Sequence, residues 1–265
     1  MKVGIVGCAG RMGRMLVAEV MASDDVTLIG GTEHSKSAFL QQDIAKLAGF
    51  DETGMIVGSD TDALFSVADV VIDFTLPQAT VSHTHAAIKH GTALVIGTTG
   101  LNEKEQAAVV KASNSVAVIQ AANFSIGVNL LLNLTSQVAS VLDNEYDIEI
   151  YEMHHRHKVD APSGTALALG QAAAKGRGVD LESVSERVRD GHTGLRSPGN
   201  IGFATLRGGD VVGDHSLIFA ADGERIELTH KASSRTVFAR GAVRSAKWCE
   251  HKAPGLYSMH DVLGL

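Results

Sequence analysis

The first 125 residues alternate short apolar runs with longer segments in which apolar residues recur at helical spacing. The runs are rich in Val, Ile and Leu and lack polar alternation, which is typical of strands that are covered on both faces. Strand–helix alternation of this kind predicts right-handed βαβ units and a parallel sheet. The expected strands are residues 3–6, 26–30, 70–74, 93–96 and 116–120, and the expected helices are residues 11–22, 80–89 and 103–112.

The pattern changes after residue 127. A helical segment at 128–141 leads into an alternating strand at 147–152, a charged loop and a second helix that begins at Thr165. Three further strands are expected at 201–206, 215–220 and 225–230, and Asp222-Gly223 between the last two is a strong hairpin signal. A final helix is expected at 236–247.

These elements predict an α/β chain with two domains. Residues 1–125 form a Rossmann-like parallel-sheet domain for a dinucleotide, and residues 126–235 form an α+β domain with a mixed or antiparallel sheet for substrate binding and oligomerisation. Residues 236–265 are expected to return to the first domain.

Composition restricts the class of protein. With 265 residues, 45% hydrophobic and 20% charged, the chain can bury a core in each of two domains. The net charge of -7 argues against a nucleic-acid partner. Two cysteines without CxxC spacing fit a reducing compartment, and we find neither an export signal nor an apolar stretch long enough for a bilayer. We therefore expect a cytoplasmic protein without a membrane partner.

A glycine-rich turn follows the first expected strand and opens the first expected helix. Its glycines permit a tight turn, close approach of a pyrophosphate and close packing of helix on strand, while the helix start supplies free N–H groups. Glycines that serve only backbone geometry remain the alternative, because a single glycine pattern is weak evidence. The turn contains Gly7, Cys8, Ala9, Gly10, Arg11, Met12 and Gly13.

The second expected strand is followed by a pair of residues, Glu33 and His34, that also point to a dinucleotide. Glu33 stands where an acid accepts hydrogen bonds from the adenosine ribose, although a solvated loop carboxylate is the alternative. His34 is placed to lie near a 2′-phosphate, or it is a surface histidine without a role. A neutral imidazole holds a phosphate less firmly than an arginine does. We therefore expect NADH to be used at least as well as NADPH.

Two later loops follow strands of the same expected sheet. Open α/β sheets bind ligands at the carboxyl ends of their strands, so small and hydroxylated residues there suit a ribose and a nicotinamide. Either loop alone would pass as an ordinary turn. The expected contributors are Gly97, Thr98, Thr99, Ala121, Ala122, Asn123 and Phe124.

The segment from residue 152 to 166 brings together three histidines, an arginine and a lysine in a chain whose net charge is negative. Ser163 is a natural N-cap, so the N–H groups of Gly164 and Thr165 are expected to face outward, where a carboxylate can bind. Lys158 offers a point-charge donor, and His154 or His155 offers an acid–base group near neutral pH. The pattern predicts a small anionic substrate.

Three other interpretations of this segment compete. The first is a solvated basic loop, the usual fate of a charge run. The second is a metal site at His154, His155 and His157, but neighbouring strand residues point to opposite faces and no H-E-x-x-H spacing exists, so we expect no metal. The third is hydrolysis by Ser163, which lacks a G-x-S-x-G elbow.

The residues described above resemble those of a specific family. The run H-H-R-H-K-x-D-A-P-S-G-T-A at residues 154–166, together with residues 7–13, 97–100, 121–129 and 230–235, closely resembles the dihydrodipicolinate reductase family, also called 4-hydroxy-tetrahydrodipicolinate reductases. The likeness extends through essentially the whole chain.

The resemblance implies an enzyme of the diaminopimelate route to lysine that reduces a cyclic dicarboxylate with NADH or NADPH. By motif position, it implies His154 as the acid–base residue and Lys158 as the proton donor. Family members are usually homotetramers assembled largely through the sheet of the second domain. The residues that the resemblance assigns to the substrate carboxylate are His155, Ser163, Gly164, Thr165 and Arg235.

Two rival functions remain open. One is another two-domain NAD(P)-dependent dehydrogenase acting on an amino acid or aldehyde. The other is a non-catalytic dinucleotide sensor, which has no need for Lys158 beside a helix start that binds carboxylates.

Overall fold

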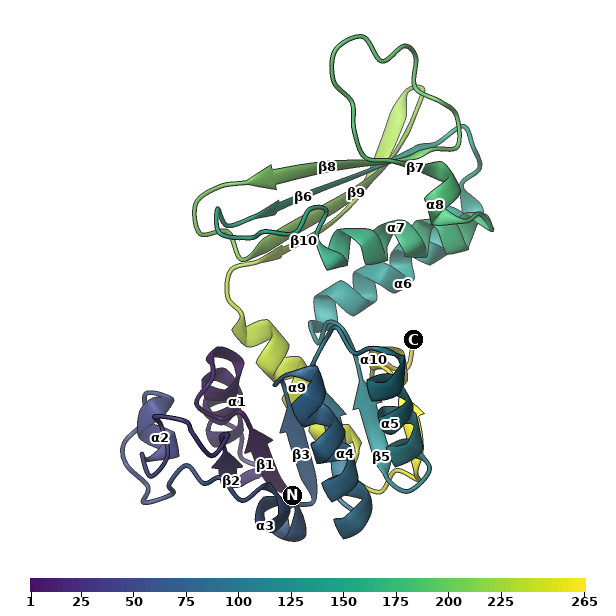
Figure 1. Cartoon of the computed structure of the whole chain (residues 1–265). Helices are drawn as coiled ribbons and strands as arrows, with labels where there is room; N and C mark the ends of the chain where they lie inside the picture. The colour runs from purple at the N-terminus through teal and green to yellow at the C-terminus, as the bar shows by residue number, and fades with distance from the viewer. The chain divides into compact units, whose positions relative to one another are not determined.

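The computed structural model describes all 265 residues, and the chain divides into two compact units. Unit 1 contains Met1–Ile126 and Thr236–Leu265, and unit 2 contains Gly127–Arg235 (Figure 1). None of the helices combines the length and apolar character that a membrane span requires.

Unit 1 is built on a sheet of six parallel strands in the order β11-β5-β4-β3-β1-β2. All five strands expected in the first 125 residues are present. From β1, the next strand along the chain, β2, is added on one side, and β3, β4 and β5 are added on the other. The strand order therefore reverses between β1 and β3, which is the switch point of the sheet. The strands are β1 (Lys2–Val6), β2 (Thr27–Thr32), β3 (Val70–Asp73), β4 (Ala93–Ile96), β5 (Ala117–Gln120) and β11 (Gly255–Tyr257).

Helices cover both faces of this sheet, which explains the unbroken apolar runs. Along β3, Val70 and Ile72 join the core under α1, α9 and α10, while Val71 joins the core under α3, α4 and α5. The two short helices α2 and α3 are not evident in the sequence pattern. The bounds are α1 (Arg11–Met21), α2 (Ile44–Leu47), α3 (Thr61–Val67), α4 (Pro77–His90), α5 (Glu103–Ser113), α9 (Thr236–Trp248) and α10 (Met259–Leu263).

Unit 2 contains a mixed sheet in the order β10-β9-β6-β8-β7. The central strand, β6, pairs parallel with β8 and antiparallel with β9. The expected hairpin between β9 and β10 is confirmed, with Gly223 in its turn at φ 89°. The strands are β6 (Asp147–His154), β7 (Ser185–Glu186), β8 (Ile201–Arg207), β9 (Gly213–Ala221) and β10 (Glu224–Ala232).

One face of the unit 2 sheet carries an apolar core beneath three helices. Ile148 and Ile150 of β6 are fully or almost fully buried there with residues from the helices. The alternation of β6 therefore separates a helix-facing row from an opposite row. The helices are α6 (Ile126–Val141), α7 (Gly164–Arg177) and α8 (Leu181–Val184).

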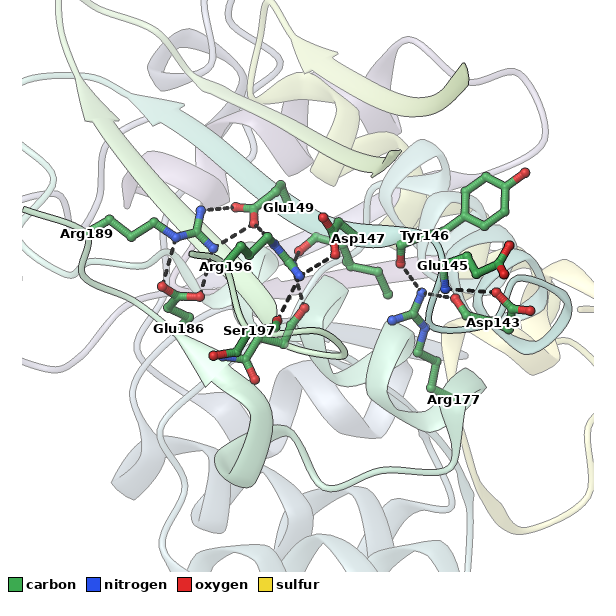
Figure 2. Close-up of polar contacts among 12 residues, drawn as sticks. Asp143, Glu145, Tyr146, Asp147, Glu149, Arg177, Glu186, Arg189, Arg196 and Ser197 are labelled. Atoms are coloured by element: carbon green, nitrogen blue, oxygen red, sulfur yellow. Dashed lines mark hydrogen bonds and ion pairs between the residues drawn. The ribbon is translucent and has the colours of Figure 1, made fainter. Parts of the chain in front are cut away.

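Charged side chains occupy the opposite row of β6. Arg189 donates to both carboxylate oxygens of Glu149, at 2.8 and 2.7 Å, and Arg196 bridges Glu149 at 2.9 Å and Asp147 at 2.6 Å (Figure 2). Both arginines belong to the long segment between β7 and β8. These ion pairs tie that segment to the sheet.

Candidate functional site

The glycine turn after β1 lies directly on the first turn of α1. Gly7 has φ +68°, and the N–H groups of Gly7 and Cys8 donate to Thr32 O at the end of β2, at 2.7 and 3.2 Å. A Cβ at Gly13 would lie 2.0 Å from Gly7 O. Glycine at position 13 is therefore required for this close packing.

The start of α1 is open toward solvent. Gly10 is the N-cap and provides no side-chain hydrogen bond, and Gly10 and Arg11 are exposed. Cys8 and Ala9 are buried, and burial together with the Glu33 carboxylate raises the pKa of the Cys8 thiol to about 12. The N–H groups of Gly7 to Gly10 donate within the protein, so the first turn of α1 is what presents free backbone N–H groups, as a site for a pyrophosphate requires.

Glu33 and His34 line the same cavity as this turn. Glu33 Oε1 accepts a hydrogen bond from Ala9 N at 3.0 Å, and His34 Nδ1 accepts one from Lys36 N at 3.2 Å. The cavity measures about 480 Å³ and is also lined by Gly7 and Gly10. The glycine cradle, the open helix start and the fixed carboxylate together fit the adenosine and pyrophosphate of a dinucleotide.

The loop after β4 contacts the loop after β3. Gly97 lies against the Phe74 ring, where a Cβ would approach ring atoms to 2.3 Å. Thr98 is buried and accepts a hydrogen bond from Thr75 N at 3.0 Å, whereas Thr99 is exposed. Thr98 therefore supports the loop, and Thr99 faces outward.

The loop after β5 is anchored to β4 and to the core. Ala121 N donates to Ile96 O at 3.2 Å, Ala122 is exposed, and Asn123 accepts a hydrogen bond from Ser125 N at 2.8 Å. The Phe124 ring is 1% exposed and packs in the core of unit 1. Phe124 therefore supports the loop from within the core.

A buried acid beneath these loops was not among the predicted site residues. Asp73, at the end of β3, accepts from Thr75 N at 2.9 Å and from Thr98 Oγ1 at 3.1 Å, and its other oxygen contacts His83 Nδ1 at 2.8 Å. Burial raises the pKa of Asp73, but the surrounding hydrogen bonds and charge, of which those of His83 are the largest, together outweigh burial and lower the pKa. An acid that ends the apolar run Val-Val-Ile was the available signal.

In unit 2, Glu152 and His154 lie two residues apart on the helix-facing row of β6, and both are buried. Glu152 Oε2 contacts His154 Nδ1 at 2.6 Å. Arg207 donates to both Glu152 oxygens, at 2.8 and 2.9 Å, and Ser163 N donates to Oε1 at 3.0 Å. Glu152 and Arg207 were not predicted as site residues; polar residues that continue the apolar row of a strand were the signal.

Ser163 is the N-cap of α7, as expected. Its Oγ accepts a hydrogen bond from Ala166 N at 3.1 Å and lies 3.0 Å from Nε2 of His215 on β9. Burial, together with the charge of His154, lowers the pKa of His215 to about 4, so His215 is neutral near pH 7. A Cβ at Gly164 would meet no atom within 4 Å, which leaves open space beside the helix start.

His155 and Arg235, both predicted to bind substrate, lie together. Arg235 Nη2 lies 3.2 Å from His155 Nε2, and a guanidinium can only donate, so His155 carries its proton on Nδ1. That Nδ1 has no partner within the protein. Burial and the charge of Arg235 lower the pKa of His155, which keeps its ring neutral. That Nδ1 is itself buried, so the pair offers the Arg235 guanidinium to an anion, and His155 orients it.

Lys158 occupies the turn that follows His155. Its backbone N donates to His155 O at 3.1 Å, and its Nζ pairs with Asp160 Oδ1 at 2.8 Å. The side chain is 20% exposed. The ammonium therefore remains accessible, and the turn is held by backbone rather than by the lysine side chain.

Sequence comparison connects both units with known proteins. The family sequence model described as "Dihydrodipicolinate reductase, N-terminus" matches residues 1–124, and the one described as "Dihydrodipicolinate reductase, C-terminus" matches residues 127–263. A 4-hydroxy-tetrahydrodipicolinate reductase from Roseobacter denitrificans is 51% identical over 265 residues, covering 100% of this chain and 97% of the relative. One from Afipia carboxidovorans is 52% identical, with coverage of 100% and 97%.

Solved structures share the fold. A dipicolinate-bound dihydrodipicolinate reductase from Paenisporosarcina sp. TG-14 superposes with a TM-score of 0.77 at 25% identity, covering 97% of each chain. A probable dehydrogenase from Thermotoga maritima gives a TM-score of 0.62 at 11% identity, covering 99% of this chain and 92% of the other, which is a likeness of fold alone.

Proposed function

The chain belongs to the dihydrodipicolinate reductase family, and we propose how its residues divide the work of that reaction. It is an oxidoreductase of lysine biosynthesis that reduces 4-hydroxy-tetrahydrodipicolinate to tetrahydrodipicolinate with NAD(P)H. Unit 1 is the dinucleotide-binding domain, and unit 2 binds the substrate. The observation that carries the assignment within unit 2 is that Glu152 joins His154 to the open start of α7.

The substrate carboxylate is held at the start of α7. Gly164 has open space beside it, the helix dipole favours an anion there, and Ser163 fixes the first turn. Thr165 N–H belongs to the same first turn. The Arg235 guanidinium, held by His155 Nε2, supplies a second partner for the dicarboxylate, and His155 belongs to the substrate site through this contact.

Conversion of 4-hydroxy-tetrahydrodipicolinate to tetrahydrodipicolinate consumes one hydride and one proton, and the 4-hydroxyl group leaves as water. NADH or NADPH bound in unit 1 supplies the hydride. Lys158 Nζ donates the proton to the ring, because its ammonium is accessible and a lysine gives up a proton more readily than an arginine. His154 acts as the acid–base group through Nε2 and keeps its Nδ1 proton on Glu152.

Different segments of unit 1 hold different parts of the cofactor. The glycine turn from Gly7 to Gly13 brings the pyrophosphate to the first turn of α1, where the N–H groups of Arg11 and Met12 hold it, and Glu33 holds the adenosine ribose. Gly97, Thr99 and the backbone of residues 121–124 border the nicotinamide side at the ends of β4 and β5.

We extend the proposal to assembly and location. A homotetramer formed through the sheet of unit 2 is what the resemblance to the family implies. Cys8 and Cys249 are both buried and unpaired, as in proteins of a reducing compartment, and this supports the cytoplasm.

A coupled assay tests the proposed substrate site. Freshly made condensation product of aspartate semialdehyde and pyruvate should drive oxidation of reduced nicotinamide, and each substrate alone should not. Pyridine-2,6-dicarboxylate, a planar dicarboxylate, should inhibit competitively with that product because both require the start of α7. Inhibition that is competitive only with NADH would contradict the placement of the substrate carboxylate in unit 2.

Cofactor preference is expected to depend on His34. The KM for NADH should be no higher than the KM for NADPH, because His34 Nδ1 already accepts a hydrogen bond from Lys36 N, which leaves a single ring nitrogen to face a 2′-phosphate. His34→Arg should lower the KM for NADPH by about tenfold relative to NADH, since a guanidinium pairs with the 2′-phosphate. His85→Arg, at an exposed position on α4, adds the same charge outside the cavity and is the control. An equal effect of both substitutions would refute the role of His34.

A further inference from the structure

Glu152 is a buried carboxylate that joins three separate parts of unit 2. It contacts His154 at the end of its own strand, Ser163 N at the start of α7 and Arg207 at the end of β8. Its side chain is 1% exposed, and both of its oxygens are engaged. A carboxylate buried to this degree is costly unless it is paired and hydrogen-bonded, and Glu152 is both.

Arg207 keeps this carboxylate ionised and fixed in direction. The two guanidinium–carboxylate hydrogen bonds form a bidentate pair, which constrains the carboxylate plane. Burial by itself raises the pKa of Glu152, but the hydrogen bonds from Arg207, His154 and Ser163 N and the charge of His154 together outweigh burial, and the pKa lies below its ordinary value. Arg207 Nη2 also donates to Asp160 O at 2.6 Å, so the same group holds the loop that carries Lys158.

An ionised carboxylate can only accept hydrogen bonds, so the 2.6 Å contact requires the proton of His154 to be on Nδ1. Nε2 is then the nitrogen left for proton transfer. Nε2 lies beside Gly213, where a Cβ would approach it to 3.0 Å, so glycine at 213 leaves room around this nitrogen.

We propose that Glu152, held by Arg207, is a positioning residue that fixes the Nδ1-protonated tautomer of His154 and aligns it with the substrate-binding start of α7. The proposal rests on the acid–base role of His154 given under Proposed function. When Nε2 takes up a proton, the carboxylate faces the resulting imidazolium; when Nε2 releases it, the Nδ1 proton stays hydrogen-bonded to Glu152. The remaining ring neighbour of His154 is His215, at 5.0 Å between centroids.

Glu152→Gln is the decisive substitution, because it keeps the volume and a carbonyl acceptor for Ser163 N but removes the charge. We expect kcat to fall by about 100-fold, the scale of lost acid–base catalysis, with the KM for NADH unchanged. Glu149→Gln is the matched control. It lies on the same strand and removes the same charge from a carboxylate that also binds arginine (Figure 2), and the alternation of β6 places it on the opposite side of the sheet from Glu152. A Glu152→Gln variant within threefold of wild type would overturn the proposal.

A double-mutant cycle separates positioning from general support of the fold. If Glu152 acts through His154, then adding Glu152→Gln to His154→Ala should lower kcat by less than about threefold further. Additive losses would overturn the proposal. A His154→Ala variant with wild-type turnover would instead contradict the proposed function, whereas low turnover of His154→Ala beside a fully active Glu152→Gln variant contradicts the positioning role alone.

The tautomer itself is observable without catalysis. In protein labelled with ¹⁵N-histidine, the His154 ring is identified among the 12 histidines by its absence in His154→Ala. At about pH 9, where unperturbed imidazoles are neutral, wild type should show the Nδ1–H pattern, and Glu152→Gln should shift His154 toward Nε2–H. An Nε2–H pattern in wild type overturns the proposal even if the Glu152→Gln variant is too unstable for kinetics.

Discussion

Lys158→Ala is expected to lower kcat by about 100-fold or more, the range of lost proton donation, while the KM for NADH stays near its wild-type value. The lysine side chain ends in an accessible ammonium whose single protein partner is the carboxylate of Asp160. The turn around it is closed by the backbone bond from Lys158 N to His155 O, which alanine preserves. The loss should therefore be chemical and should leave the melting temperature nearly unchanged.

Two further variants make this result specific. Lys158→Arg retains the positive charge, but a guanidinium does not release its proton near neutral pH, so this variant should be almost as slow as Lys158→Ala. Lys175→Ala removes the same charge from an exposed position in the last turn of α7 and should behave like wild type. Full activity of Lys158→Arg would show that Lys158 contributes charge rather than a proton, and full activity of Lys158→Ala would remove it from the mechanism.

The sequence predicted the fold well wherever one physical constraint dominated. The parallel strands of unit 1 are apolar on both faces, so their runs stand out. The β9–β10 hairpin is fixed by Asp222-Gly223, because the turn requires a residue that tolerates positive φ. The helices α2 and α3 were missed because each is short and buries only two residues, too few to establish a helical period.

The candidate site was predictable where function needs a local motif and unpredictable where it needs a partner far along the chain. Ser163 could be predicted as an N-cap because capping involves neighbouring residues. Arg207 could not be predicted to pair with Glu152, because their contact depends on the parallel pairing of β6 with β8. For the same reason, the contact of Asp73 with Thr98 could not be predicted, although the acid at the end of an apolar run was itself a signal.

Gly13→Ala should destabilise unit 1 and weaken its binding of the cofactor. An alanine Cβ would lie 2.0 Å from Gly7 O and 2.7 Å from two atoms of Cys8, and all three are backbone atoms of the turn itself. Backbone cannot move aside as the end of a flexible side chain does, so the turn and α1 must separate. Overpacking of this kind costs roughly 3 kcal/mol, at the upper end of its usual range. For a unit of this size, that corresponds to a fall of about 6–12 °C in melting temperature.

The loss of cofactor binding should exceed what lower stability alone explains. Separation of the turn from α1 displaces the N–H groups that face the pyrophosphate and weakens the bond from Ala9 N to Glu33, so the NADH dissociation constant, measured by fluorescence at a temperature where the variant is fully folded, should rise by about tenfold or more. Gly58→Ala is the matched control, because its Cβ would meet no atom closer than 3.9 Å and its φ is not in the positive range. If Gly13→Ala bound NADH as tightly as Gly58→Ala does, the close contact between Gly13 and Gly7 would not be what shapes the cofactor turn. A variant that is destabilised but still binds NADH would show that Gly13 contributes to the packing of unit 1 and not to the cofactor site.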